Sequence, residues 1–78
     1  ETPRSRARSY LKEGARLHRI GEYAEAERLF REAIAIDPRN ADGFFNLGAL
    51  AEGRGDLISA LSQYRAGLTI QPNDAALK

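Results

Sequence analysis

Two stretches of this sequence are near-copies of each other. Residues 21–40 read GEYAEAERLFREAIAIDPRN, and residues 55–74 read GDLISALSQYRAGLTIQPND. Identical residues recur 34 positions apart, at Gly21/Gly55, Ala26/Ala60, Arg31/Arg65, Ile36/Ile70 and Pro38/Pro72. A fixed period of this length indicates a repeat architecture, in which one small unit cannot bury its apolar face alone and stacks on a copy of itself.

Both copies have the pattern of a helical hairpin, because apolar residues return every three to four positions. Gly21, Gly55, Pro38 and Pro72 mark expected helix ends, since glycine tolerates positive φ and proline lacks an amide hydrogen. Helices are therefore expected from residue 7 to Gly21, from about 23 to Pro38, over 41–54 and from 57 to Pro72. Residues 1–6 are expected to form a flexible lead-in, and residues 75–78 the start of a truncated fifth helix.

The same pattern predicts which residues face the core and which cap the helices. Asn40 and Asp56 are expected N-caps. The expected inward positions are Ala7, Tyr10, Leu11, Gly14, Leu17, Ile20, Tyr23, Ala26, Phe30, Ala33, Ile34, Phe44, Leu47, Gly48, Ala51, Leu57, Ala60, Leu61, Tyr64 and Leu68.

A 34-residue helical hairpin with these residues resembles the tetratricopeptide repeat (TPR) family. Unit one would span residues 7–40 and unit two residues 41–74, and an unrelated four-helix bundle is the alternative. The resemblance implies an all-α, right-handed α-solenoid in which small residues stand where helices cross. The signature positions are Tyr10, Gly14, Gly21, Ala26, Phe30, Ala33, Pro38, Phe44, Leu47, Gly48, Gly55, Ala60, Tyr64, Gly67 and Pro72.

Unit one departs from the family pattern at two positions of its first helix. Glu13 and Arg16 stand where unit two has Leu47 and Leu50. Burying unpaired charge is unfavourable. We therefore expect unit one to be the first repeat, without a packed neighbour upstream.

Composition limits the classes of function. The chain has 78 residues, 42% hydrophobic and 29% charged, which is ordinary for one soluble globular domain. It has no cysteine, so disulfides and thiolate sites are excluded, and the sequence favours neither an oxidising nor a reducing compartment. It also has no methionine, so we expect it to be a piece of a longer protein. No apolar run approaches the roughly 20 residues of a membrane-spanning helix.

Residues for catalysis or cofactor binding are not apparent. His18 is the only histidine and is expected on an exposed helix surface, with no carboxylates spaced to share a metal ion with it. The glycines do not form a phosphate-binding loop, and the serines lack a visible base. We expect no enzyme activity, no cofactor and no metal.

The resemblance implies instead that the first helix of each unit lines a groove for a protein or peptide ligand. The corresponding groove positions are Arg8, Leu11, Lys12, Ala15, His18 and Arg19 in unit one, and Asp42, Phe45, Asn46, Ala49, Glu52 and Gly53 in unit two. Small residues such as Ala15 leave room for a ligand backbone, Phe45 could anchor an apolar side chain, and the Asn46 amide could bond to a peptide backbone. Asn46 could equally be a solvated residue.

Positive charge is concentrated at the start of the chain. Residues 1–20 hold six basic and two acidic groups, whereas the remainder holds six basic and nine acidic groups. Arg8, Lys12 and Arg19, which we call the basic stripe, lie within about 40° of one another on a helical wheel. The stripe is either a solvated face or a surface that favours acidic peptides.

One TPR subtype grips the terminal carboxylate of partners such as heat-shock chaperones. Its first repeat needs lysine and asparagine where this sequence has Leu11 and Ala15, so we expect that a complete carboxylate clamp is absent.

Two other functions compete with peptide binding. The arginine-rich start could contact nucleic acid, but the chain as a whole is not basic and no aromatic accompanies the arginines for base stacking. Two repeats also leave apolar faces uncovered, so a structural role or self-association is the other alternative.

Overall fold

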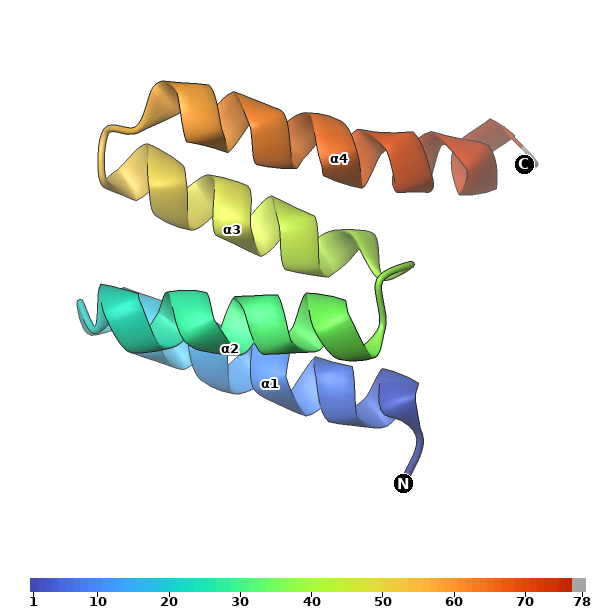
Figure 1. The fold of residues 1–78 in the computed structure, drawn as a ribbon, viewed down its shortest axis with the longest axis horizontal. Coiled ribbons are helices and arrows are strands. Elements are labelled where there is room, and N and C mark those ends of the chain that lie inside the picture. The colour runs from blue at the N-terminus through green and yellow to red at the C-terminus, as the bar shows by residue number, and fades with distance from the viewer. Residues whose placement is uncertain (77–78) are drawn as a thin grey trace.

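The computed structural model describes the backbone of residues 1–76 and the side chains of residues 1–70. This part of the chain forms four helices, α1 (Pro3–Arg19), α2 (Tyr23–Ile36), α3 (Ala41–Gly53) and α4 (Leu57–Ala76), with no strand among them. They stack as two hairpins in a slab of 37 × 33 × 18 Å (Figure 1). Helix α1 packs on α2 and α3 on α4, and the hairpins meet mainly through α2 and α3. The predicted all-α helical repeat is confirmed.

Helix α1 begins four residues earlier than the sequence pattern suggested. Thr2 is its N-cap: the Ser5 amide donates to Thr2 Oγ1 at 3.1 Å, and the Thr2 amide donates to Ser5 Oγ at 3.1 Å. Pro3 occupies the first helical position, where its fixed φ suits the helix and its missing amide hydrogen costs nothing. The prediction of a flexible lead-in over residues 1–6 is therefore wrong for residues 3–6.

The turn inside each hairpin is the same glycine-dependent motif. Gly21 has φ +87° and Gly55 has φ +82°, the left-handed conformation that favours glycine. After α1, the Gly21 amide donates to the His18 carbonyl at 3.1 Å and the Glu22 amide to the Leu17 carbonyl at 2.9 Å. The same two bonds recur after α3, so both expected helix ends are Schellman motifs.

The connection between the hairpins also follows the sequence. Helix α2 ends at Ile36, before Pro38. Asn40 then caps α3, its Oδ1 accepting from the Asp42 amide at 3.0 Å. Asp56 caps α4 in the same way, accepting from the Ser59 amide at 3.2 Å, and hydrogen bonding to Ser59 lowers the pKa of Asp56. Both predicted N-caps are confirmed.

Helix α4 does not end at Pro72, contrary to the sequence prediction. It continues to Ala76, so residues 75–76 belong to α4 and no separate fifth helix begins within residues 1–76; residues 77–78 lie outside the described part. Proline removes one hydrogen bond and crowds the carbonyl four residues earlier, which favours a helix end without requiring one. Within the described residues, no later helix packs on α4 and requires the chain to turn at Pro72.

The core is built where an aromatic ring of one helix lies over a glycine of the next. A Cβ on Gly14 would lie 2.6 Å from Phe30 Cε1, and Phe30 itself is 0% exposed. A Cβ on Gly48 would lie 2.5 Å from Tyr64 Cε1. The predicted helix crossings are thus confirmed. Leu47 and Leu50 extend the Phe30 cluster from the first hairpin into the second.

A polar contact also joins the hairpins. The Glu27 carboxylate on α2 lies 3.0 Å from Arg54 Nη1 at the end of α3, and 2.6 Å from Arg31 Nη2 on its own helix. Both contacts border a hollow of about 140 Å³ between α2, α3 and α4. Glu27 therefore reinforces the apolar contact between the two hairpins.

Several predicted core positions are exposed. Ile20 is 61% exposed and Tyr23 39%, because both lie at the turn between α1 and α2. Leu57, Leu61 and Leu68 of α4 are 64%, 52% and 51% exposed. Their helical spacing is that of a buried face, but no further layer covers α4 within the described residues. Leu29, at 6% exposure, is a core residue that the pattern did not single out.

None of the described helices has a stretch that is both long and apolar enough to cross a membrane.

Candidate functional site

A hollow of about 320 Å³ opens between the two hairpins. It lies at the end of the molecule where Figure 1 places the N-terminus. We call it the N-terminal hollow. Its residues come from α1, the α2–α3 turn, α3 and α4, so it exists only because the two hairpins stack. They are Arg4, Arg8, Leu11, Asp37, Arg39, Asn40, Ala41, Asp42 and Ile70.

Local structure brings the polar residues of the hollow together. Arg4 and Arg8 are one helical turn apart on α1, and Arg4 is helical because the Thr2 cap starts the helix at Pro3. Arg39 lies in the short turn after Pro38, and Asn40 is held by its capping bond to Asp42. The hollow therefore joins the start of α1 to the start of α3.

The hollow combines apolar residues with charged ones. Leu11 and Ala41 are each 7% exposed and Ile70 is half-buried. Arg4, Arg8 and Arg39 line the hollow together with Asp37 and Asp42, and none of the three arginines forms an ion pair with any side chain described in residues 1–70. Unpaired guanidinium groups at a concave surface can form charge-assisted hydrogen bonds to carboxylates or phosphates.

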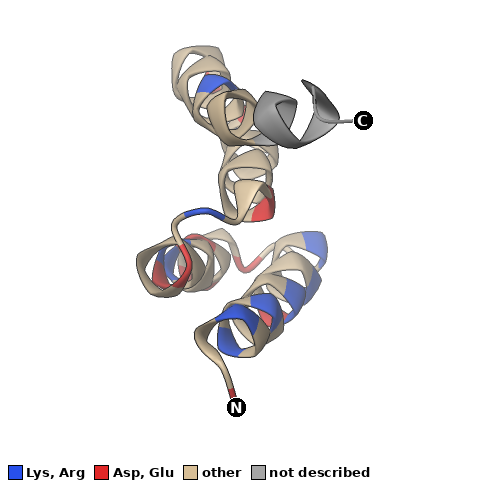
Figure 2. Cartoon of the chain, turned by 90° about the vertical axis from the view of Figure 1, so that its right-hand side faces the viewer, with Lys and Arg blue, Asp and Glu red and all other residues tan. Residues whose placement is uncertain are grey.

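The basic stripe continues the N-terminal hollow along α1, and Figure 2 shows lysine and arginine residues along this helix. Arg8, Lys12 and Arg19 are exposed. Lys12 and Arg19 border a second, shallower hollow of about 280 Å³, together with Ser9, Glu13 and Arg16. Arg4 lies one turn before Arg8 and extends the basic stripe toward the N-terminus.

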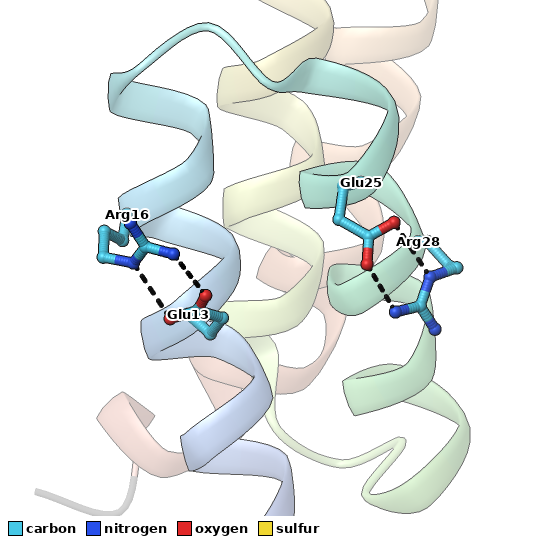
Figure 3. Close-up of polar contacts among 4 residues, drawn as sticks. All are labelled: Glu13, Arg16, Glu25 and Arg28. Atoms are coloured by element: carbon cyan, nitrogen blue, oxygen red, sulfur yellow. Dashed lines mark hydrogen bonds and ion pairs between the residues drawn. The ribbon is translucent and has the colours of Figure 1, made fainter.

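Arg16 differs from the stripe, because its charge is already paired. Its Nε and Nη2 donate to the Glu13 carboxylate at 3.0 and 2.6 Å (Figure 3). The hydrogen bond from Arg16 lowers the pKa of Glu13. Arg28 makes the same forked contact to Glu25 on α2 and lowers the pKa of Glu25 (Figure 3). Both pairs are exposed, and in each pair the two charges neutralise each other. Glu13 and Arg16, the two charged positions that depart from the family pattern, are therefore paired on the surface.

On α3 the groove candidates in the middle of the helix are half-buried. Asn46 and Ala49 are half-buried, like Ala15 on α1, and Asp42 is exposed. Phe45 is half-buried over Gly67, where an added Cβ would lie 2.5 Å from Phe45 Cε1. The ring of Phe45 thus packs within the second hairpin, and only part of it remains open to a ligand.

Glu52 and His18 are engaged in contacts inside the chain. The Tyr64 hydroxyl donates to Glu52 Oε1 at 2.7 Å, and this hydrogen bond raises the pKa of Tyr64. His18 is half-buried, with its ring edge-on to that of Tyr23 at a centroid distance of 5.5 Å. The prediction of an exposed histidine is wrong, because His18 lies where the end of α1 meets the start of α2 and Gly53 of α3.

The structure thus brings together three of the predicted groove residues, Arg8, Leu11 and Asp42, in the N-terminal hollow. Lys12 and Arg19 lie beside it, whereas Ala15, Phe45, Asn46 and Ala49 line neither hollow. Sequence reasoning missed Arg4, Arg39 and Asn40 as lining residues. A signal for Arg4 existed, since threonine, proline and serine at positions 2, 3 and 5 are a helix start.

Comparisons with known proteins agree with this architecture. The family described as TPR repeat matches residues 14–52, which is half of the chain. The chain is also similar to the Hsp70-Hsp90 organizing protein of Triticum aestivum, with 33% identity over 69 residues. That alignment covers 88% of this chain but 12% of the relative, so the chain spans a small part of it. TPR repeats generally act as protein–protein interaction modules. With its two glycine-crossed hairpins and this match, the chain belongs to the tetratricopeptide repeat family.

Proposed function

We propose that this chain binds an extended acidic segment of a partner protein along α1, across the N-terminal hollow and beside the groove positions of α3. The observation that carries the proposal is the hollow itself, in which Arg4, Arg8 and Arg39 stand around a concave surface without an ion-pair partner among the described side chains. Cations left unpaired beside a concave surface favour an anionic ligand through charge-assisted hydrogen bonds and electrostatic steering.

The α3 side of the surface supports a peptide rather than a small anion. Asn46 is half-buried, and its amide makes no side-chain hydrogen bond to residues 1–70. An amide can donate to and accept from a peptide backbone at once. Ala15 and Ala49 are small, which lets a ligand backbone come close to both helices.

The wheat relative is named as an organiser of Hsp70 and Hsp90, which raises the question of a chaperone tail as ligand. A clamp for a terminal carboxylate would need a lysine at Leu11, and Leu11 is 7% exposed and belongs to the core. We therefore propose that side-chain carboxylates, not the end of the ligand chain, are the main contacts. A peptide with a free terminus should then bind no better than its amidated form.

The direct test is fluorescence anisotropy with a labelled acidic peptide at low and moderate salt. Arg8→Gln and Asn46→Ala should each weaken binding several-fold while circular dichroism shows unchanged helicity. Arg28→Gln is the matched control, because it removes one arginine from α2, away from the groove. Equal losses in Arg8→Gln and Arg28→Gln, or no binding by the wild-type chain, would refute the proposal.

Nucleic-acid binding is tested in the same assay by adding an unrelated oligonucleotide as competitor. Phosphate contacts weaken steeply with salt, so competition should disappear at moderate salt if the peptide is the ligand. Competition that persists there would favour the nucleic-acid alternative.

Self-association is a second candidate, favoured by the surface of α4. Ile58 is 86% exposed beside the exposed leucines of α4, and Arg65 is the only charged residue from 57 to 70. Charge depletion with exposed apolar residues is typical of the core of a protein interface. Sedimentation at several concentrations should detect a dimer that Leu61→Glu abolishes, and a monomer at every concentration would exclude this role.

A further inference from the structure

We infer that the α1 surface selects acidic segments in which carboxylates occupy every second residue, each facing one of Arg4, Arg8 and Lys12. The inference rests on the proposed peptide-binding function and adds the spacing of the ligand's charges. It uses Arg4, which enters the surface only because α1 starts at Pro3.

The spacing follows from helix and strand dimensions. Arg4, Arg8 and Lys12 are four residues apart, and at a rise of about 1.5 Å per residue they lie about 6 Å apart along α1. An extended peptide advances about 3.3 Å per residue, so its alternate residues lie about 6.6 Å apart. Over the three sites the two spacings drift apart by about 1 Å, which flexible arginine and lysine side chains can span.

Direction agrees with spacing. Successive side chains of an extended chain point to opposite sides, so only alternate residues can face α1. On the helix, steps of four residues turn by about 40°, which keeps Arg4, Arg8 and Lys12 within about 80° of one another. All three are exposed. If the carboxylates of a ligand were on adjacent residues, some of them would point away from α1.

The start of α1 strengthens the attraction for anions. A helix N-terminus carries partial positive charge, which acidic residues normally offset, but the first turn of α1 contains no acidic residue. Its capping box uses Ser5, so the cap adds no negative charge. Arg4 and Arg6 add two cations at this end. A ligand carboxylate placed here would meet the helix dipole and the arginines together.

Two carboxylates of the hollow influence where the acidic side chains of a ligand lie. Asp37, at the end of α2, and Asp42, on α3, line the same hollow, together with Arg39 of the turn between them. Like charges repel, so the acidic side chains of a ligand are directed away from Asp37 and Asp42 and toward the arginines. Arg16 does not add a further site, because Glu13 already pairs with it.

The test uses two labelled peptides of identical composition and about nine residues, each with three glutamates among serine and alanine. One has the glutamates at every second position and the other has them adjacent. In anisotropy titrations the alternating peptide should bind about threefold tighter or more, the size expected when an exposed ion pair is gained. Equal affinities would overturn the spacing inference and leave the proposed function standing. If neither peptide binds, the proposed function falls and takes the inference with it.

Variants assign the effect to the three side chains. Arg4→Gln, Arg8→Gln and Lys12→Gln should each reduce binding of the alternating peptide by about threefold and reduce its preference over the adjacent one. Arg16→Gln is the matched control, because it removes the same charge from the same helix at a position already paired. If Arg16→Gln reduces the preference as much as Arg8→Gln, net charge and not the register of the stripe explains selection.

Discussion

The two hairpins share one framework and differ in what they present to their surroundings. In each, an aromatic ring of the second helix covers a glycine of the first, Phe30 over Gly14 and Tyr64 over Gly48. The outer helix of the first hairpin, α1, carries charged residues, whereas α4 exposes leucines. The repeat therefore preserves the contact within a hairpin, while the outward faces of the two hairpins differ.

The hairpins also fill the same space in different ways. The first has Leu11 and Ala33 where the second has Phe45 and Gly67, 34 residues later in each case. Leu11 is 7% and Ala33 1% exposed, whereas Phe45 packs so closely on Gly67 that an added Cβ would lie 2.5 Å away. A larger ring on one helix is thus matched by a smaller residue on its partner. At this pair of positions the two copies conserve volume and not residue type.

The largest expected loss of stability comes from replacing the glycines that lie under aromatic rings, and it should differ between the two hairpins. Gly14→Leu should destabilise the chain by about 3 kcal/mol, because the fully buried Phe30 has no space into which to move. Gly48→Leu should cost less, about 1–2 kcal/mol, because the half-buried Tyr64 can shift toward solvent. Urea titrations followed by circular dichroism measure both.

Gly53→Leu provides the control for this pair. Gly53 is exposed near the end of α3, and a Cβ there would meet nothing nearer than His18 Nε2 at 3.6 Å. Replacing a helical glycine without a clash gains up to about 1 kcal/mol in helix propensity. If Gly14→Leu proves as stable as Gly53→Leu, the helix crossing is assigned to the wrong residue.

A swap between hairpins tests the idea of conserved volume. Gly67→Ala alone should cost about 1–3 kcal/mol, since the new methyl group overlaps the Phe45 ring. Adding Phe45→Leu recreates the pair found in the first hairpin and should recover much of the loss. Thermal denaturation of the single and double variants decides the question, and additive losses would show that the two sites do not share one space.

A smaller effect is expected where the two hairpins meet. Glu27→Gln removes the charge that contacts Arg54, the residue after α3, and Arg31 of α2, and should cost about 0.5–1 kcal/mol, as for a partly exposed ion pair. A double-mutant cycle with Arg54→Gln isolates the part that joins the hairpins. A coupling energy of zero would mean that apolar packing alone holds them together.

The smallest effect concerns alkaline pH and only the second hairpin. Hydrogen bonding to Glu52 raises the pKa of Tyr64, so the folded state favours the neutral phenol. The resulting stability is present below the unfolded-state pKa of about 10 and is lost as pH rises through the higher folded-state pKa. The fall in melting temperature between about pH 8 and pH 11 should therefore be smaller for Tyr64→Phe than for the wild-type chain. Identical falls in the two proteins would contradict this prediction. The first hairpin has Phe30 at the position equivalent to Tyr64, so it has no phenol there to ionise.

Much of the fold could be predicted from sequence because its signals are local or strictly periodic. The 34-residue period, the turn glycines at positive φ, the caps Asn40 and Asp56, and the end of α2 before Pro38 all follow from backbone chemistry within a few residues. Where two local signals competed, prediction failed. The cap at Thr2 outweighed the lack of apolar periodicity at the start of α1, and helix continuation outweighed Pro72.

The candidate site was less predictable, since exposure depends on what packs nearby. Leu11 and Phe45 occupy groove positions of the family, yet one is buried in the core and the other packs on Gly67. Arg39 and Asn40 come to face Arg4 and Arg8 only through the stacking of the hairpins. The spacing of these residues along the chain does not indicate how close they lie in the folded protein.

The sequence by itself thus determined four helices, two hairpins and the stripe of basic residues along α1, because hydrogen bonding, capping and helical periodicity act over a few residues. Only the tertiary structure decided that Arg4 joins that stripe's surface, that the leucines of α4 remain exposed, and that a hollow forms between α1 and α3. These features depend on contacts between residues distant in the chain, whose burial is settled by how the hairpins pack.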